Sequence, residues 1–311
     1  MRILVIRPGA LGDFIVTIPV LRALMAGYPD AEHHLMAPGF ARELLEPRNP
    51  GLRFHHLDLP GSHTFFSEAL EPDARLAGFF QPFDLILSYW GDAEAIFSKQ
   101  LARCCSGRLL CWHPKPAEDF PGHVTEYLFE PLKGLGVPMT FESPLLPSTE
   151  SEISRARSRL DSLGLRERFV LCHPGSGSPT KNWPAERFAH LSQELKTKAD
   201  SDMLFVEGPA DEETASRVRR ANGSQFKWLQ HPPLGELIGL LSMAALTIGN
   251  DSGISHLAGA SGSPALAIFG PTRPELWGPI GEKVRTLKGS PDLLRPSIEE
   301  VATVALRMLQ S

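Results

Sequence analysis

Long hydrophobic runs are missing from this chain of 311 residues. No apolar stretch reaches the roughly 18 residues that are needed to cross a bilayer. At the N-terminus, Arg7 and Pro8 interrupt the apolar segment too early for a secretory signal. We therefore expect a cytoplasmic protein with no membrane-spanning segment.

Cysteine is scarce, with four residues in the whole chain. The adjacent Cys104 and Cys105 lack the spacing of zinc-binding pairs. A disulfide framework is typical of much smaller secreted chains. We expect the cysteines to be inert thiols without a metal or redox role.

An excess of positive charge is also missing. Residues 1–150 contain 12 Lys and Arg against 18 Asp and Glu, a net charge of −6, whereas residues 151–311 contain 19 against 18, a net charge of +1. Neither half has the basic balance of a nucleic-acid-binding protein. The second half accommodates an anionic ligand more easily than the first.

Two glycine signatures do not occur where strands lead into helices. The first glycine loop is neither a G-x-G-x-x-G fingerprint nor a P-loop ending in G-K-[ST]. A dinucleotide-dependent dehydrogenase and an NTP hydrolase are therefore disfavoured. A fixed internal repeat and low-complexity tracts are absent as well.

Alternating strand and helix patterns fill most of the chain. Short β-branched runs predict buried strands, and apolar residues at helical spacing predict the helices between them. The expected strands are 2–7, 83–88, 169–172, 203–206, 246–248 and 265–269, with a short one near 226. Helices are expected from about 13 to 25, at 150–163, from about 211, at 234–243 and after 251. This alternation predicts α/β architecture with doubly wound parallel sheets, although the pattern is less clear between 28 and 82.

The length of the chain favours two domains. A polar, proline-containing stretch at 141–149 has the composition of a linker. We expect two Rossmann-like domains, 1–148 and 149–311, that face each other across a cleft. Pro19 lies inside the first expected helix and should kink it, because proline cannot donate a backbone hydrogen bond.

The first candidate loop joins the first strand to its helix. Gly9 and Gly12 allow a tight turn and a close approach to a ligand, and Asp13 stands where the helix begins. Asp13 can act as an N-cap, as a general base at a cleft, or as both.

The second candidate loop follows the strand at 169–172 and runs from His173 to Lys181. Ser176 and its small neighbours offer hydroxyl and backbone N–H groups to phosphate oxygens. Lys181 can offset the negative charge of a departing diphosphate, or it can be a solvated loop lysine. His173 is expected to be structural, bonding within the loop.

The third candidate loop follows the strand at 246–248. A helix N-terminus carries unpaired N–H groups and partial positive charge, and Ser252 and Gly253 in its first turn let an anion approach. His256 lies on the same face as Ser252, so both can point at one ligand, and a packed helix histidine is the alternative. Asp251 is a natural N-cap that would repel a diphosphate, so we expect it to contact sugar hydroxyls or to brace the loop.

A D-x-D pattern at Asp200 and Asp202 is of the kind that metal-dependent sugar transferases use. It falls in a charged turn between a helix and a strand, which favours solvated surface.

Three motifs in order resemble glycosyltransferase family 9, the heptosyltransferases of the lipopolysaccharide inner core. They are Gly9-x-x-Gly12-Asp13, His173-Pro-Gly…Lys181-x-Trp183-Pro184, and Asp251-Ser-Gly-x-Ser-His256-Leu-Ala followed by Phe269-Gly-Pro-Thr272. The resemblance covers most of 1–28 and 168–285. It implies the GT-B fold, with the acceptor on the first domain and the donor on the second, and inversion at the anomeric carbon without a metal or other cofactor.

The resemblance also implies roles for individual residues. Asp13 would deprotonate the acceptor hydroxyl, while Lys181, Ser176 and the helix start at 252–253 would hold the donor phosphates. Glu212 falls where the family has a ribose-binding acid. The implied partners are a nucleotide sugar, ADP-linked, and a glycan or glycolipid acceptor, with peripheral contact at the inner face of the inner membrane.

The first domain departs from the family pattern in charge. Relatives that act on phosphorylated core sugars have a basic stretch there, whereas 60–69 is nearly free of positive charge. A polyanionic lipopolysaccharide acceptor is therefore less supported than the donor. A GT-B-fold nucleotide-sugar epimerase and a non-catalytic nucleotide-sugar-binding protein remain as alternatives.

Overall fold

The computed structural model describes residues 1–91, 95–139, 143–222, 225–310. The chain divides into two compact units, Met1–Glu142 and Ser143–Ser311. The expected division after residue 148 lies six residues further along the chain. Part of the expected linker, 141–142, lies outside the described residues.

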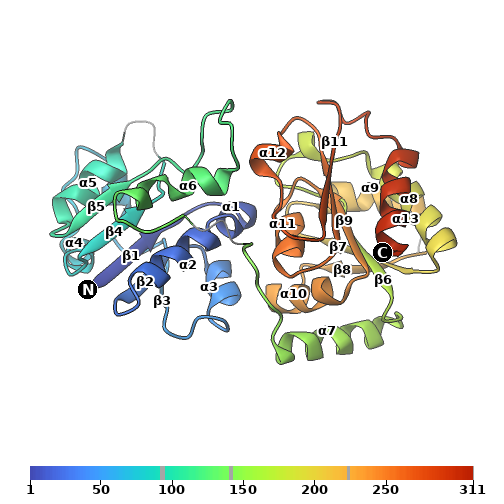
Figure 1. The fold of residues 1–311 in the computed structure, drawn as a ribbon, viewed down its shortest axis with the longest axis horizontal. Coiled ribbons are helices and arrows are strands. Elements are labelled where there is room, and N and C mark those ends of the chain that lie inside the picture. The colour runs from blue at the N-terminus through green and yellow to red at the C-terminus, as the bar shows by residue number, and fades with distance from the viewer. Residues whose placement is uncertain (92–94, 140–142, 223–224, 311) are drawn as a thin grey trace. The chain divides into compact units, whose positions relative to one another are not determined.

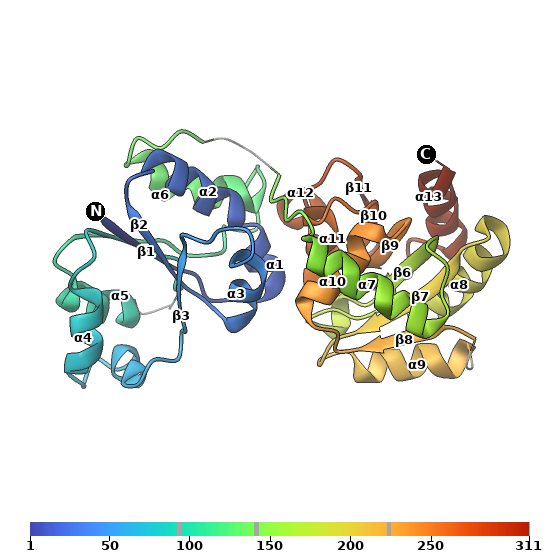
Figure 2. The same cartoon turned by 90° about the horizontal axis from the view of Figure 1, so that it is seen from below.

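The first unit contains a five-stranded sheet in the order β3-β2-β1-β4-β5, with every neighbouring pair parallel (Figures 1 and 2). Its strands are β1 (Arg2–Ile6), β2 (Glu32–Met36), β3 (Arg53–His55), β4 (Leu85–Ser88) and β5 (Arg108–Cys111). Its helices are α1 (Leu11–Ile15), α2 (Ile18–Gly27), α3 (Gly39–Leu45), the 3₁₀ turn η1 (Ser62–Phe66), α4 (Ala74–Phe80), α5 (Ile96–Cys104) and α6 (Val124–Lys133). Helices α2 and α6 cover one face of the sheet, and α4 and α5 cover the other.

The second unit contains a six-stranded parallel sheet in the order β11-β10-β9-β6-β7-β8. Its strands are β6 (Phe169–His173), β7 (Asp202–Glu207), β8 (Lys227–Gln230), β9 (Leu246–Asn250), β10 (Ala265–Phe269) and β11 (Val284–Lys288). Its helices are α7 (Glu150–Leu163), the 3₁₀ turn η2 (Pro179–Lys181), α8 (Ala185–Ala199), α9 (Glu212–Asn222), α10 (Leu234–Met243), α11 (Gly253–Ala260), α12 (Pro274–Trp277) and α13 (Ile298–Gln310).

The core of the second unit explains why its strands could be recognised. Every residue of β6, β9 and β10 is buried, as expected for central parallel strands that are covered on both faces. Helix α8 packs against α9 and α13 on one face, and α10 packs against α7 and α11 (Figure 1). The prediction of two doubly wound α/β sheets is confirmed.

Local sequence signals fix the ends of α7. Thr149 accepts the backbone N–H of Glu152 at 3.3 Å, and the Glu152 carboxylate accepts the N–H of Thr149 at 2.8 Å, which forms a capping box. Gly164 ends the helix with a φ of 65°, a conformation that glycine adopts readily. The helix therefore begins and ends where the sequence predicts.

The expected helix from 13 to 25 is wrong as a single kinked helix. Two helices occur instead: α1 ends at Ile15, and α2 begins at Ile18 after the N-cap Thr17. Pro19 occupies the first turn of α2, where its missing N–H would have no intrahelical partner anyway. The proline therefore helps to start a helix rather than bend one.

The structure shows no helix, within the residues it describes, that is long and apolar enough to cross a membrane.

Candidate active site

Two of the candidate loops meet in the second unit. Strand order reverses between β6 and β9: β7 and β8 extend from one side of this pair, and β10 and β11 from the other. His173, at the end of β6, pairs with Gly249 near the end of β9. The loops that follow these two strands therefore leave the same edge of the sheet, at the topological switch point where open α/β sheets bind ligands.

The N-terminus of α11 lies at this switch point. Ser252 is the N-cap, with extended backbone angles of φ −150° and ψ 161°, and its hydroxyl oxygen accepts the N–H of Ser255 at 3.4 Å. Gly253 is the first helical residue. The expectation that Asp251 caps this helix is wrong, because the chain reaches the helix one residue later. The unpaired N–H groups of the first turn give this point partial positive charge.

Asp251 instead braces the loops around it, which is one of its two expected roles. Its Oδ2 lies 2.8 Å from Nζ of Lys181 and accepts the hydroxyl of Thr272 at 2.6 Å. The Asp251 side chain is 7% exposed and that of Lys181 is 32% exposed. A partly exposed ammonium group is thus held beside the start of α11 by a buried carboxylate.

The segment that carries Thr272 is itself fixed from β11. Nζ of Lys288 donates to the carbonyl oxygens of Gly270 at 3.0 Å and Thr272 at 2.5 Å. Thr272 belongs to the Phe269-Gly-Pro-Thr272 motif, but its contact with Asp251 could not be inferred from sequence spacing.

The remaining predicted donor-side residues differ in their surroundings. Ser176 is buried, and its hydroxyl donates to the carbonyl of Ser178 at 2.6 Å. Glu212 is exposed on the first turn of α9. His256 is buried on α11, four residues after Ser252.

Asp211, which directly precedes Glu212 and was not predicted from the sequence, is buried. Its Oδ2 bonds with Nε2 of His173 at 2.9 Å and accepts the N–H of Gly208 at 2.7 Å. Burial acts to raise the pKa of Asp211, but the hydrogen bonds from His173 and from the N–H of Gly208 outweigh it and lower that pKa. The expectation that His173 bonds within its own loop is wrong, because its two ring nitrogens face Asp211 and Ser252, which lie on other elements.

Asn250 is a second residue that sequence reasoning missed. Its Nδ2 donates to the carbonyls of Pro174 at 2.8 Å and Gly175 at 3.3 Å, and its Oδ1 accepts the N–H of Trp183 at 2.9 Å. This fully buried amide ties the end of β9 to both ends of the loop that contains Lys181. The shape of that loop thus depends on a residue nearly 70 positions away.

Gly175 gives a test of this packing. A Cβ at position 175 would lie 1.8 Å from Oδ1 of Asp211, whereas a Cβ at Gly177 would meet nothing within 4 Å. We expect Gly175→Ala to destabilise the protein by about 1–3 kcal/mol, as overpacking commonly does. Denaturant unfolding measures the change, and Gly177→Ala is the matched control. Equal stabilities of the two variants would contradict this packing.

The first unit places Asp13 on α1, after β1. Gly9 has a φ of +120°, which only glycine adopts readily, so the expected tight turn is present there. Gly12 lies inside α1, so the expectation of a turn at that glycine is wrong. The N-cap is Ala10, and Asp13 is the third helical residue, with Oδ2 accepting the N–H of Ala10 at 3.2 Å. Asp13 is therefore not the N-cap that one of its expected roles required.

The side chain of Arg7 stabilises the loop between β1 and α1. It is buried and donates three hydrogen bonds: from Nε to Oγ1 of Thr17 at 2.7 Å, from Nη1 to the carbonyl of Pro8 at 2.9 Å, and from Nη2 to the carbonyl of Asp13 at 2.7 Å. Burial lowers the pKa of Arg7, and the charge of Asp13 acts to raise it. A buried cation thus fixes the backbone that carries the Asp13 carboxylate.

The surface around 60–69 is apolar and acidic rather than basic. Phe66 is 43% exposed and packs against Trp90 and Phe97. Two nearby cations are already paired: Lys99 lies 2.6 Å from Glu68, and Arg103 pairs with Glu71. The low positive charge that the sequence indicates here is thus reinforced by ion pairing.

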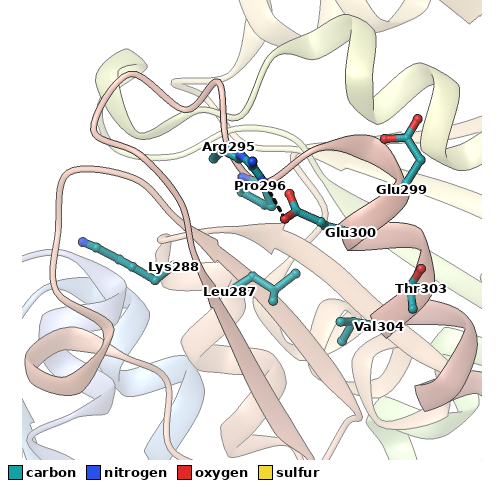
Figure 3. Close-up of a pocket in the computed structure, with 8 residues that line it drawn as sticks. All are labelled: Leu287, Lys288, Arg295, Pro296, Glu299, Glu300, Thr303 and Val304. Carbon is teal, nitrogen blue, oxygen red and sulfur yellow. Dashed lines mark hydrogen bonds and ion pairs between the residues drawn. The ribbon is translucent and has the colours of Figure 1, made fainter.

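A hollow of about 630 Å³ lies between β11 and α13 (Figure 3). Arg295 and Glu300 form an ion pair of 2.7 Å in its wall, and the amino group of Lys288 points away from that pair. None of the predicted site residues lines it. We therefore place the candidate active site at the β6–β9 switch point and not in this hollow.

The D-x-D segment is surface, as expected. Asp200 and Asp202 both form ion pairs with Arg166, and the side chain of Asp200 is 91% exposed. Within the part of the chain that the structure describes, three histidine, cysteine or carboxylate side chains nowhere gather as a metal site would require.

Comparisons with known proteins agree on one family. The model of glycosyltransferase family 9 (heptosyltransferase) matches residues 113–300. Lipooligosaccharide heptosyltransferase 2 of Haemophilus influenzae is 24% identical, and the match covers 93% of this chain and 88% of that protein.

Solved structures agree on the fold. A family 9 glycosyl transferase from Veillonella parvula has a TM-score of 0.80 at 22% identity, with 99% of this chain and 97% of that one covered. The E. coli ADP-heptose lipopolysaccharide heptosyltransferase II has a TM-score of 0.79 at 22% identity, with 100% and 99% covered.

Proposed function

The chain belongs to glycosyltransferase family 9, a heptosyltransferase family, and on that premise we propose that it transfers a heptose from ADP-heptose to a hydroxyl of the lipopolysaccharide core or a related glycan. The donor would bind at the β6–β9 switch point of the second unit, and Asp13 of the first unit would be the base.

One observation carries the donor half of this proposal. The start of α11, the ammonium of Lys181 and the hydroxyl of Ser252 all lie at the carboxyl edge of β6 and β9. Positive charge and hydrogen-bond donors at one point suit a diphosphate, which offers only acceptors. The E. coli protein of similar fold is named for ADP-heptose, which supports an ADP-linked donor.

The proposed chemistry is a direct displacement at the anomeric carbon. Asp13 takes the proton of the acceptor hydroxyl as its oxygen attacks, and the bond to the diphosphate breaks on the opposite side, which inverts the configuration. Negative charge grows on the leaving diphosphate. Lys181 and the first-turn N–H groups of α11 stabilise that charge.

Before the donor binds, the ion pair with Asp251 holds the Lys181 ammonium in place. An arriving diphosphate competes with Asp251 for the Lys181 ammonium, while the Thr272 hydroxyl stays on the carboxylate. Asp251 is then free to accept hydrogen bonds from sugar hydroxyls. In this proposal Asp251 braces the loops before the donor binds and contacts the sugar hydroxyls afterwards.

The other assignments extend the same proposal. Ser176 would turn its hydroxyl towards the phosphates, Glu212 would bind the ribose, and His256 would line the donor site from α11. Lys181 and the α11 N-terminus supply the positive charge at the leaving group, so we propose that no metal or cofactor is required. We place the activity in the cytoplasm, with peripheral contact at the inner face of the inner membrane, where a glycolipid acceptor is reached.

A thermal-shift comparison of ADP-, UDP- and GDP-sugars tests the donor class. Ligands that bind only the folded protein raise its melting temperature, and the rise grows with the logarithm of the ligand concentration relative to the dissociation constant. We expect an ADP-sugar to stabilise the protein more than the other two. Stabilisation by a UDP- or GDP-sugar alone would contradict the ADP assignment, and stabilisation by none of them would contradict a nucleotide-sugar site.

Arg7→Met should lower kcat by roughly 10²-fold, because a displacement of a catalytic group by about 1 Å has effects of this size. The change removes the three hydrogen bonds that fix the loop before Asp13. Steady-state kinetics with ADP-heptose and acceptor measure the effect. Arg2→Met is the control, since Arg2 is exposed and pairs with Glu32 on the neighbouring strand. A wild-type kcat in Arg7→Met would show that the loop does not need this support.

A further inference from the structure

Three buried side chains form a hydrogen-bonded chain that ends at the proposed diphosphate site. Oγ of Ser252 lies 3.3 Å from Nδ1 of His173, and Nε2 of His173 lies 2.9 Å from Oδ2 of Asp211. Ser252 is 7%, His173 3% and Asp211 5% exposed. They come from the N-cap of α11, the end of β6 and the residue before α9.

The hydrogens in this chain can be counted. An ionised Asp211 only accepts, and its Oδ2 already receives the N–H of Gly208 at 2.7 Å. Nε2 of His173 must therefore carry a hydrogen. In a neutral imidazole Nδ1 is then a bare acceptor, and its partner Ser252 must donate to it. The Ser252 oxygen meanwhile accepts the N–H of Ser255.

A diphosphate at the start of α11 conflicts with that arrangement. Ser252 has a single hydroxyl hydrogen, and the phosphate oxygens, like Nδ1 of His173, can only accept. If the hydroxyl turns to the diphosphate, a buried acceptor loses its donor, which is costly in a protein interior. A hydrogen on Nδ1 removes the conflict, since Nδ1 can then donate to the Ser252 oxygen.

We propose that His173 takes up one proton from solvent when the donor diphosphate binds, so that the Ser252–His173 hydrogen bond reverses and the Ser252 hydroxyl donates to the diphosphate. The carboxylate of Asp211 stabilises the imidazolium that forms. This inference rests on the proposed function, because it needs the diphosphate at the α11 N-terminus. His173 and Asp211 are positioning residues that act through Ser252.

The charges around His173 are compatible with an added proton. Asp211 and the diphosphate favour the imidazolium, whereas Lys181, which pairs with Asp251 before the donor binds and with the diphosphate afterwards, opposes it. The other histidines near this chain of hydrogen bonds are His256, on the same helix as Ser252, and His231, which would favour the ionised form of Asp211 when protonated. With a diphosphate bound, the anionic groups next to His173 thus exceed the cationic ones.

The order Ser, His, Asp is also that of serine hydrolases, but the surroundings of Ser252 differ from those of a nucleophile. Ser252 is the N-cap of α11, and its oxygen accepts a backbone hydrogen bond from Ser255 within the helix. The group is therefore oriented to donate a hydrogen bond.

Calorimetric titration with ADP-heptose, without acceptor, tests the proposal. The observed enthalpy is measured near pH 7.5 in PIPES and in Tris, whose ionisation enthalpies differ, so that the difference counts the protons exchanged. The diphosphate of ADP-heptose is doubly esterified and does not titrate near this pH, so uptake reports the protein. We expect wild type to take up close to one proton per ligand bound.

Variants of these residues distinguish a positioning role from a purely structural one. His173→Gln should abolish the proton uptake, and Ser252→Ala should abolish it as well, although the histidine is intact. Asp211→Asn should reduce the uptake and weaken binding about tenfold, since the imidazolium loses its counter-charge. Ser252→Ala removes one oxygen atom, so it keeps the test available if His173→Gln does not fold.

The outcomes are distinguishable. Binding by wild type without proton uptake would overturn this inference and leave the proposed function standing. The same uptake in wild type and in His173→Gln, or in wild type and Ser252→Ala, would also overturn it. Failure of wild type to bind ADP-heptose at all would overturn both the inference and the proposed donor.

Discussion

Replacing Asp13 by asparagine is expected to lower kcat by roughly 10²- to 10⁴-fold, the contribution typical of a general base. Asparagine has nearly the same shape and keeps an oxygen to accept the N–H of Ala10, which Asp13 accepts at 3.2 Å. The loop after β1 should therefore keep its conformation. Only the ability to take a proton from the acceptor hydroxyl is lost.

The binding of ADP separates this effect from misfolding. The proposed diphosphate site lies wholly in the second unit, so Asp13→Asn should bind ADP as wild type does. Asp30→Asn is a matched control, because Asp30 is exposed in a turn of the same unit. An Asp13→Asn protein with the wild-type kcat would show that another group is the base.

Lys181→Met should have the second largest effect on turnover, lowering kcat by roughly 10²- to 10³-fold, the range seen when one preorganised donor to a developing anion is removed. The negative charge on the departing diphosphate would then be met by the N–H groups of α11 and by Ser252 alone. Lys181→Arg keeps the positive charge and should retain much more activity. Equal kcat values for the two variants would contradict a charge-based role.

Lys181→Met should also be less stable than the wild-type protein. Asp251 is nearly buried and would lose the Lys181 ammonium, keeping the Thr272 hydroxyl. Because Lys181 is about one third exposed, the loss should be smaller than the ~3–5 kcal/mol for breaking a fully buried pair. Thermal unfolding gives the melting temperature of Lys181→Met, and the kinetics must be measured well below that temperature.

The fold was predictable because its signals are local. Buried parallel strands appear in sequence as short β-branched runs, and the capping box of Thr149 with Glu152 marks the start of α7. The break between α1 and α2 was not predictable from periodicity, since apolar residues continue through it. Pro19 is compatible with either a kink or a first turn, and only packing decides between them.

The two carboxylates that were expected to cap helices show that residue type alone does not locate a helix cap. Asp13 and Asp251 stand within a few residues of a helix start, but the caps are Ala10 and Ser252. The cap is the residue whose backbone is extended when the helix begins, and that is set by the loop path before it. Residue type alone could not resolve a shift of one to three positions.

Sequence motifs located the loops of the site but not the contacts between them. Lys181 and Asp251 were each singled out, yet their ion pair joins residues 70 positions apart. Arg7, Asn250 and Asp211 were missed because an arginine, an amide and a carboxylate look like surface residues until the fold buries them. Such residues are recognised by burial and by partners that are distant in sequence.

Release of ADP from ADP-heptose, measured with and without a lipopolysaccharide core that lacks its heptose, tests the central claim most directly. We predict that wild-type protein releases ADP only when the acceptor is present, in a one-to-one ratio with heptosylated product, and that Asp13→Asn releases it at least roughly 10²-fold more slowly. Release of ADP, or epimerised ADP-heptose, from the donor alone at the same rate as with acceptor would contradict the account.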